Sequence, residues 1–264
     1  MQEKGTVFFP ERILEATPKD YGLGSYEDVF FPATDDTRLH GWLVDGPDHR
    51  AVLLWFHGNA GNISHRLDNL QMLHKALRIP IFLFDYREYG LSEGTISKAG
   101  TFLDAQGAYR FLTEERGFAP SSVMLLGRSL GTALAVFVAS RKHVLGVVLE
   151  AAFTSTDDMM KLHFPMYKPE AVGNNKYDNL ALIGLIQSPI LFIHGQLDRT
   201  IPIAMARTLH AQARAPKYLY EIAGAGHNDT YLVGGRKYQT VWRQFLAKCL
   251  QRKQCASHAS EPLR

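Results

Sequence analysis

The stretch Val123-Met124-Leu125-Leu126-Gly127-Arg128-Ser129-Leu130-Gly131 decides the fold that we expect for this chain. Its first four residues predict a strand buried on both faces, and the small, apolar residues 130–141 predict a helix packed on the sheet. Between them, a glycine on each side of Ser129 permits a turn too tight for Cβ atoms at those two positions. The serine hydroxyl would then project from the strand end above a helix N-terminus, where negative charge is stabilised. G-x-S-x-G alone is a weak signal, and the strand–turn–helix context makes it informative.

Apolar runs alternate with segments of helical periodicity along most of the 264-residue chain. Strands are expected at residues 26–33, 39–44, 51–56, 80–84, 122–126, 144–149, 189–193 and 217–222. Helices are expected at residues 65–77, 99–115, 130–141, 203–213 and 231–249. This alternation implies an α/β protein with a mostly parallel central sheet and helices on both faces. The first two strands flank the turn Thr34-Asp35-Asp36 and are expected to form an antiparallel N-terminal edge.

A chain of this length is expected to form one domain, which we place at residues 1–250. One stretch, at about 154–187, is longer and less regular than a simple crossover between strands, and it carries Pro165 and Pro169 as breakers. We expect it to form a small cap insert over the strand ends. The polar residues 251–264 are expected to be a flexible tail.

The composition argues against several classes of protein. The formal net charge is +3 and no run of Lys or Arg exceeds two residues, so no nucleic-acid partner is expected. Cys249 and Cys255 lack the spacing of metal ligands, and no metal is expected. The N-terminus lacks a signal-peptide pattern, and no apolar run reaches the ~18 residues of a membrane span. As given, the chain is expected to be soluble and cytoplasmic.

A serine hydroxyl needs a base to become a nucleophile, and we assign this role to His227. His227 lies in a glycine-rich loop between the last strand and the last helix. In a fold of this kind the orienting acid lies between nucleophile and base along the chain, and Asp198, after the strand at 189–193, fits. Glu150 is a rival acid, for which we favour a structural hydrogen bond to the cap or to the Asp198 loop. Asp229 is expected at a helix N-terminus.

The other histidines are expected to be structural. His57 and His194 each end a buried strand, where a ring can brace a loop. The remaining ones, His40 and His65 among them, look like surface or core residues without a paired acid. His227 is therefore the histidine to which we assign chemistry.

A second informative segment, His57-Gly58-Asn59-Ala60-Gly61-Asn62, follows the third strand. Acyl transfer needs two preorganised N–H donors for the oxyanion. One is expected from the backbone of Leu130, directly after the nucleophile, and the other from the backbone of Asn59. Without the serine motif, this segment would also fit a plain glycine-rich connection into a helix.

These motifs resemble those of the α/β-hydrolase superfamily, in particular a branch with H-G-N-A-G-N after the third strand. The same branch has D-Y-R-x-Y-G-x-S-x-G after the fourth strand, matched here by residues 85–94. The resemblance runs in order from about Glu27 to Phe245. It implies an α/β-hydrolase fold, the Ser129–Asp198–His227 assignment and esterase-type activity, and no cofactor is required. Such proteins are similar to membrane-associated serine hydrolases acting on acyl esters, lipids or thioesters, and to bacterial esterases.

Two features of the chain depart from this resemblance, and a third concerns the segment 85–94. Glu88 stands where the family more often has glycine, which would reshape the loop beside the pocket. Relatives often begin with a membrane anchor just upstream of a segment like residues 7–12; the chain is either natively soluble, or an anchor lies outside the given sequence. Asp85 and Arg87 are expected to pin the loop after the fourth strand by an internal ion pair, with direct contact to the substrate as the alternative.

The reaction expected from these residues is hydrolysis of a small-molecule acyl ester or lipid through an acyl-enzyme on Ser129. The Met and aromatic side chains of the cap would line an acyl pocket or belong to the core. Alternatives are a peptidase or amidase of the same fold, an acyltransferase, and a non-catalytic ligand-binding protein. A halide-releasing hydrolase is disfavoured, because such enzymes place Asp at the position of Ser129.

Overall fold

The computed structural model describes residues 8–164, 166 and 176–259, and at 256–259 only the backbone. Eight strands form one twisted sheet in the order β10-β9-β8-β7-β4-β6-β3-β2. The strands from β10 to β6 are parallel, whereas β3 runs antiparallel to both β6 and β2. The predicted mostly parallel sheet with an antiparallel N-terminal edge is therefore present.

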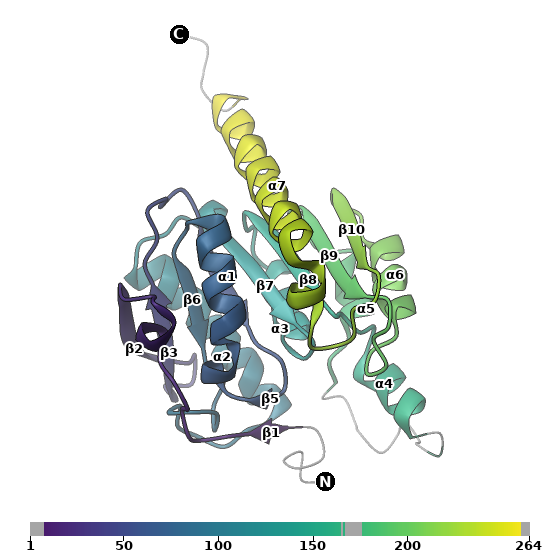
Figure 1. Cartoon of the computed structure of the whole chain (residues 1–264), viewed down its shortest axis with the longest axis horizontal. Coiled ribbons are helices and arrows are strands. Elements are labelled where there is room, and N and C mark those ends of the chain that lie inside the picture. Colours follow the sequence, from purple (N-terminus) through teal and green to yellow (C-terminus); the bar gives the residue numbers. More distant parts are fainter. Residues whose placement is uncertain (1–7, 165, 167–175, 260–264) are drawn as a thin grey trace.

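The elements follow the expected alternation of strand and helix (Figure 1). The strands are β1 (Phe9–Pro10), β2 (Tyr26–Pro32), β3 (Arg38–Val44), β4 (Val52–Phe56), β5 (Ala60–Gly61), β6 (Ile81–Phe84), β7 (Val123–Arg128), β8 (Gly146–Glu150), β9 (Ile190–Gly195) and β10 (Lys217–Ile222). The helices are α1 (Leu67–Leu77), α2 (Lys98–Arg110), α3 (Gly131–Ala139), α4 (Thr156–His163), α5 (Asn179–Ile183), α6 (Ile203–Gln212) and α7 (Thr230–Ala259). A π-helical turn, Phe111–Glu115, extends α2.

Each face of the sheet has its own apolar core. On one face, α1 and α7 pack against strand side chains such as Leu53 and Leu126, and Figure 1 shows these two helices in front of the sheet. On the opposite face, α2, α3, α5 and α6 cover residues such as Leu125 and Phe192. Because neighbouring strand residues point to opposite faces, strands buried on both sides read as continuous apolar runs, as β4 does.

Some boundaries differ from those expected. The two-residue strands β1 and β5 pair in parallel as a separate small sheet, which their short, irregular sequences did not indicate. Helix α7 continues through Ala259, whereas we expected a tail from residue 251; its apolar side chains pack against the sheet as far as Leu250. The flexibility of the tail stays a prediction. Residues 260–264 lie outside the described residues. None of the described helices combines the length and the apolar character needed to span a membrane.

The expected cap at 154–187 is described only in part. Helices α4 and α5 belong to it, and residues 165 and 167–175 lie outside the described residues. Ser155 begins α4 by accepting a hydrogen bond from the Asp158 amide, which is typical of a helix N-cap. The side chain of Asp178 begins α5 in the same way, through the amide of Ala181. Both helix starts are thus fixed by local side chains at the ends of the insert.

The expected ion pair between Asp85 and Arg87 is absent. Arg87 instead bridges Asp104 on α2, at 2.7 Å, and Asp35 in the turn between β2 and β3, at 3.0 Å. Asp85 instead accepts from the amide of Ile63 at 3.0 Å, so the two side chains take separate partners. Burial raises the pKa of Asp104 to about 6, although the Arg87 guanidinium opposes that rise.

Replacing Arg87 tests this bridge. The Asp104 side chain is fully buried, so Arg87→Met would leave a buried carboxylate without its partner. We expect the free energy of unfolding to fall by about 3–5 kcal/mol, measured by urea denaturation near pH 7.5. Asp35→Asn is the matched control: its side chain is 37% exposed, and we expect a loss of about 1 kcal/mol or less. Equal losses for the two variants would contradict this account.

Candidate active site

Ser129 sits at the sharp turn from β7 into α3. Its φ of 51° lies in the left-handed region, and its amide donates to the carbonyl of Glu150 on β8 at 2.9 Å. A Cβ at Gly127 would lie 2.5 Å from the carbonyl oxygen of Gly131, and a Cβ at Gly131 would collide with the carbonyl of Phe56. The two glycines are therefore required by close backbone approach, as the sequence predicted.

The structure brings together the three residues predicted for the triad. The Nε2 atom of His227 lies 3.1 Å from the Oγ atom of Ser129, and its Nδ1 atom lies 2.8 Å from Oδ2 of Asp198. These residues come from three separate turns at the carboxyl ends of β7, β9 and β10. The distances allow a proton to pass from the serine hydroxyl to an imidazole held by a carboxylate.

Asp198 is held as a charged acceptor. Burial acts to raise its pKa, but hydrogen bonds from His194 and His227 outweigh burial and leave the pKa below its usual range. Its Oδ1 atom accepts from the amides of Thr200 at 2.9 Å and Ile201 at 2.8 Å. His194 also bonds the carbonyl of Ile201, so it braces this loop as expected. The acid is thus oriented before any ligand binds.

The rival acid Glu150 has other partners. Its carboxylate is fully buried and accepts hydrogen bonds from the hydroxyls of Thr230 and Tyr238, both on α7. Its Oε1 atom lies 3.4 Å from Nε of Arg128. The role is structural, as expected, but the partners are α7 and Arg128 rather than the cap or the Asp198 loop. Asp229 stands directly before α7, as predicted, and its carboxylate accepts from the amide of Gly226.

The loop after β4 reaches the serine from the other side. Gly58 is so placed that a Cβ there would lie 3.6 Å from the Cβ of Ser129. The predicted oxyanion donors Asn59 and Leu130 line the same cavity as Ser129 and His227. The Leu130 amide is at the start of α3, where the first N–H groups have no acceptor within the helix. Both residues lie in the wall of the serine's cavity, and their role as oxyanion donors stays a prediction.

Residues that follow β6 hold this loop in place. The Tyr86 hydroxyl donates to the carbonyl of His57 at 2.7 Å, and the His57 ring stacks on that of Tyr86. The Tyr89 hydroxyl donates to Oδ1 of Asn59 at 3.0 Å. Burial raises the pKa of both phenols, so they remain donors. The segment 85–94 therefore acts on the site by bracing the loop that carries Asn59.

Two further features of this segment concern Asp85 and Glu88. Asp85 accepts from the amide of Ile63 at 3.0 Å and lies 3.4 Å from Nε2 of His57. Burial lowers the pKa of His57 to about 3, which keeps the ring neutral. Glu88 adopts a φ of 67°, a conformation that favours the glycine found more often in the resembling family. Its carboxylate accepts from the amide of Ile96, which helps to hold this turn.

The cavity above Ser129 has a volume of about 650 Å³. One side is apolar and includes Leu130, Phe153, Ile201 and two side chains of α4, Met159 and Met160. The cap therefore contributes side chains to the wall beside the serine. The volume is in the range of small-molecule sites.

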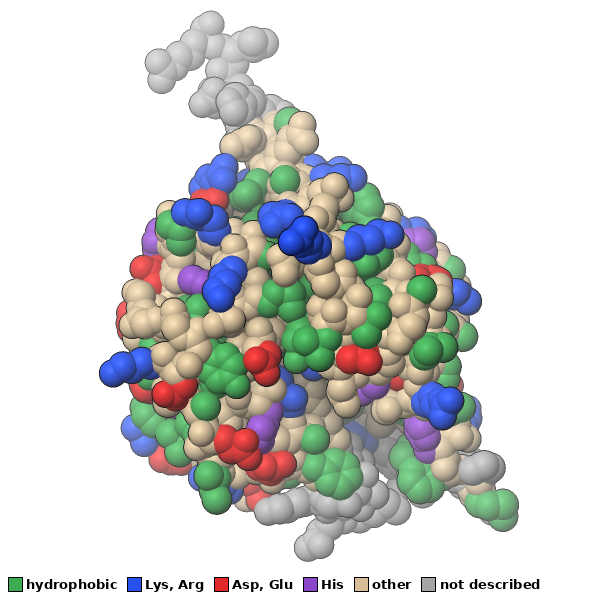
Figure 2. All heavy atoms as spheres, viewed as in Figure 1, with side chains coloured by type: hydrophobic (Ala, Val, Ile, Leu, Met, Phe, Trp, Pro, Cys, Tyr) green, Lys and Arg blue, Asp and Glu red, His purple; other side chains and the backbone are tan. Residues whose placement is uncertain are grey.

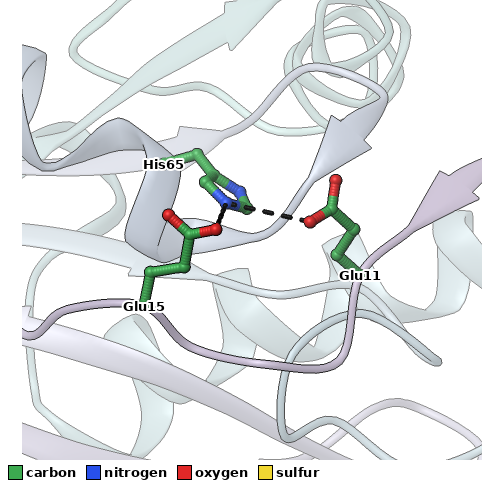
Figure 3. Close-up of side chains that lie close together, drawn as sticks. All are labelled: Glu11, Glu15 and His65. Carbon is green, nitrogen blue, oxygen red and sulfur yellow. Dashed lines mark ion pairs between the residues drawn. The ribbon is translucent and has the colours of Figure 1, made fainter.

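A cluster of titratable groups lies at the rim of this cavity. Glu11, Glu15 and His65 place ligand atoms within 4.8 Å of one another (Figure 3). The Nδ1 atom of His65 accepts from the Asn62 amide at 3.0 Å, so in the neutral ring the proton is on Nε2, which faces Glu15 at 3.4 Å. This pattern ties the N-terminal segment to the loop after β4.

The prediction that His40 and His65 have no paired acid is wrong. His65 faces Glu15, and His40 bonds Asp28 at 2.9 Å across the β2–β3 pair. These acids are distant in sequence or lie on a neighbouring strand, so spacing along the chain gave no sign of them. The sequence analysis also passed over Arg66, which lines the cavity and belongs to no motif that we singled out.

Comparison with known proteins agrees with this geometry. No protein-family model matches the chain. The alpha/beta hydrolase domain-containing protein WAV2 of Arabidopsis thaliana is 33% identical over 244 residues, covering 84% of this chain and 79% of that protein. The "uncharacterized membrane protein" YNL320W of Saccharomyces cerevisiae is 30% identical over 236 residues, covering 87% of this chain and 82% of the relative. The solved structure of Pyrococcus furiosus esterase Pf2001 superposes with a TM-score of 0.77 at 20% identity, covering 92% of this chain and 99% of that one.

The chain belongs to the α/β-hydrolase superfamily. The predicted fold class is confirmed by the sheet order, by the helices on both faces and by the match to a solved structure over nearly the whole chain. The narrower branch that carries the two motifs stays a prediction.

Proposed function

We propose that this protein is a serine hydrolase that cleaves carboxylic esters through an acyl-enzyme on Ser129. The observation that carries the proposal is the pair of contacts made by His227, to Ser129 at 3.1 Å and to Asp198 at 2.8 Å. Similarity to a protein named an esterase supports the choice of substrate bond. The substrate would be a small-molecule acyl ester or a lipid.

The proposed reaction has two steps. In the first, the Ser129 hydroxyl attacks the ester carbonyl while His227 takes its proton, and the imidazolium then gives that proton to the leaving alcohol. In the second, water attacks the acyl-enzyme, His227 takes the proton of the water, and Ser129 regains its hydroxyl as the acid leaves. Asp198 keeps the imidazole in the correct tautomer and stabilises its charged form. The amides of Asn59 and Leu130 would stabilise the oxyanion, and one such donor contributes about 3 kcal/mol.

The cavity suggests where the acyl group would lie. Met159 and Met160 of α4, with Phe153, form an apolar wall beside the serine. Methionine side chains adapt to ligands of irregular shape, which suits an acyl chain. The cap would in this way contribute to substrate choice.

A panel of p-nitrophenyl esters from acetyl to palmitoyl tests the proposal, with p-nitroanilides of the same acyl groups as the amide comparison. We expect the esters to be hydrolysed, with a kcat/KM that rises from acetyl as a longer acyl chain contacts more of the apolar wall. We expect the anilides to be hydrolysed at least about tenfold more slowly. A fluorophosphonate probe should label Ser129 in the folded protein, as read by peptide mass spectrometry. Absence of labelling would favour a non-catalytic ligand-binding protein, and faster anilide turnover would favour an amidase.

The cytoplasmic location predicted from the sequence remains a prediction. One yeast relative is named a membrane protein, and that name applies to the relative. Fractionation of the tagged, full-length protein between cytosol and membranes would decide the point for this chain.

A further inference from the structure

One corner of the active-site cavity is basic. Arg128 ends β7 directly before Ser129, and Arg66 stands directly before α1; both line the cavity. Among the described residues that line it, none is an aspartate or a glutamate. In Figure 2 the lower part of this face is hollowed, and basic atoms are visible inside the hollow. A ligand against this lining would therefore meet two guanidinium groups, with the carboxylates of Glu11 and Glu15 beside His65 only at the rim.

Arg66 has no ion-pair partner within the described part of the chain. It donates a hydrogen bond to a neutral carbonyl, that of Ala60. Its Nε atom is buried and has no hydrogen-bond partner. Burial, followed by the charge of Arg128, lowers the pKa of Arg66 from its usual value. The buried carboxylate of Asp85 opposes that lowering of the pKa without forming an ion pair with Arg66.

Arg128 is only partly compensated. Its Nε atom lies 3.4 Å from Glu150, and its NH2 group donates to the carbonyl of His227 at 3.1 Å. Glu150 also accepts from two hydroxyls on α7, so this single carboxylate is shared among three donors. The carboxylates that act on the two guanidinium groups, Glu150 and Asp85, do not line the cavity.

Neutral donors complete the corner. Asn69, on the first turn of α1, is 3% exposed, and neither its amide nitrogen nor its amide oxygen has a hydrogen-bond partner. Buried side-chain amides are almost always hydrogen-bonded in folded proteins. Tyr231 and Asn228 line the cavity beside it, and burial raises the pKa of the Tyr231 phenol, which stays a donor. An oxyanion with several acceptor oxygens would satisfy the N–H and O–H donors among these groups.

We infer that this corner binds a phosphate group carried by the alcohol portion of the ester substrate. Two guanidinium groups that line one cavity, with a side-chain amide, match the oxygens of a phosphate monoester. Arg128 bonds the backbone of His227, the residue that would return a proton to the leaving alcohol, so the basic corner lies on the leaving-group side. The phosphate stays on the released alcohol, and no P–O bond breaks. This inference rests on the proposed ester hydrolysis.

Two substrates that differ only by the phosphate test the inference: 1-butyryl-glycerol and 1-butyryl-glycerol 3-phosphate. For the wild type we expect kcat/KM to be about 10- to 100-fold higher for the phosphorylated ester, as charged hydrogen bonds would give. In Arg66→Gln we expect that ratio to fall by at least about tenfold. Arg236→Gln is the matched control, because Arg236 is exposed on α7 and does not line the cavity; its ratio should match the wild type.

Inorganic phosphate gives a second readout that does not depend on the lipid-like alcohol. It should inhibit p-nitrophenyl butyrate hydrolysis competitively in the wild type, with an inhibition constant at least about tenfold weaker in Arg66→Gln. Arg66→Lys keeps the charge but loses the planar fork, so it should retain part of the preference. If Arg66 only held the Ala60 loop in place, its replacement would change kcat for both glycerol esters together. The ratio of their kcat/KM values would then stay as in the wild type.

Equal kcat/KM for the two glycerol esters in the wild type would overturn the inference, and so would a preference that survives Arg66→Gln. Either result, with p-nitrophenyl butyrate still hydrolysed, leaves the proposed function standing. If no ester is hydrolysed, calorimetric titration of inorganic phosphate into wild type and Arg66→Gln still decides whether the corner binds phosphate. Binding lost in the variant would support the corner, and no binding to the wild type would overturn it.

Discussion

Ser129→Ala is expected to lower kcat for p-nitrophenyl ester hydrolysis by a factor on the order of 10⁵ to 10⁶. The hydroxyl is the atom that His227 contacts at 3.1 Å, and no other serine lines the described cavity wall. Alanine retains the Cβ atom, so the strain at a φ of 51° is the same in both proteins. The loss would therefore report chemistry and not folding, which near-ultraviolet circular dichroism and the melting temperature would check.

Ser140→Ala is a suitable control for this experiment. Ser140 follows the other end of the same helix, α3. Its hydroxyl makes only local hydrogen bonds, donating to the carbonyl of Phe137 and accepting from the exposed Arg141 side chain. We expect its kcat to stay within about twofold of the wild type, as is usual for a substitution away from the reacting atoms. Full activity in Ser129→Ala would end the assignment of this nucleophile.

Asp198→Asn is expected to lower kcat by about 10⁴-fold while leaving the fold intact. An asparagine amide would donate to Nδ1 of His227, and the ring would then carry its proton on Nε2, facing Ser129. In that tautomer the imidazole cannot accept the serine proton. Steady-state kinetics at a pH near 8 would measure the loss.

Glu150→Gln separates the two candidate acids. Its side chain contacts Thr230, Tyr238 and Arg128 but not His227, so we expect a loss of stability and only a small change in kcat. Because a glutamine oxygen replaces two carboxylate oxygens, one buried hydroxyl would lose its acceptor, at a cost of about 1–3 kcal/mol. If Glu150→Gln lost as much kcat as Asp198→Asn, Asp198 could not be the sole orienting acid.

Asp198→Asn is also expected to change how the stability of the protein depends on pH. The pKa of Asp198 is lowered in the folded protein, so its charge contributes stability that is present above the unfolded pKa of about 3.9. That contribution disappears as the pH falls through the lower folded value. When the free energy of unfolding is measured against falling pH, Asp198→Asn should therefore lack this contribution. That result would show that the Asp198 carboxylate is charged in the folded wild type.

Local residue types were enough to predict the central part of the fold. Gly127 and Gly131 flank Ser129 where a Cβ would meet backbone atoms, and that demand is encoded within five residues. The apolar runs of β4 and β7 predicted buried parallel strands, because a strand covered on both faces has no solvent side to mark with polar residues. The chain order Ser129, Asp198, His227 followed from the same strand–turn–helix context.

Tertiary structure alone decided which distant groups meet. Arg87 reaches Asp104 and not the adjacent Asp85, and Glu150 faces α7 and not His227, because these choices depend on distances between packed elements. Spacing along the chain carries no such distances. Arg66 and Arg128 line one cavity, although one stands before α1 and the other ends β7. Only the folded sheet brings these two positions together. Sequence therefore specified the turn that carries the serine, and packing specified the charges that surround it.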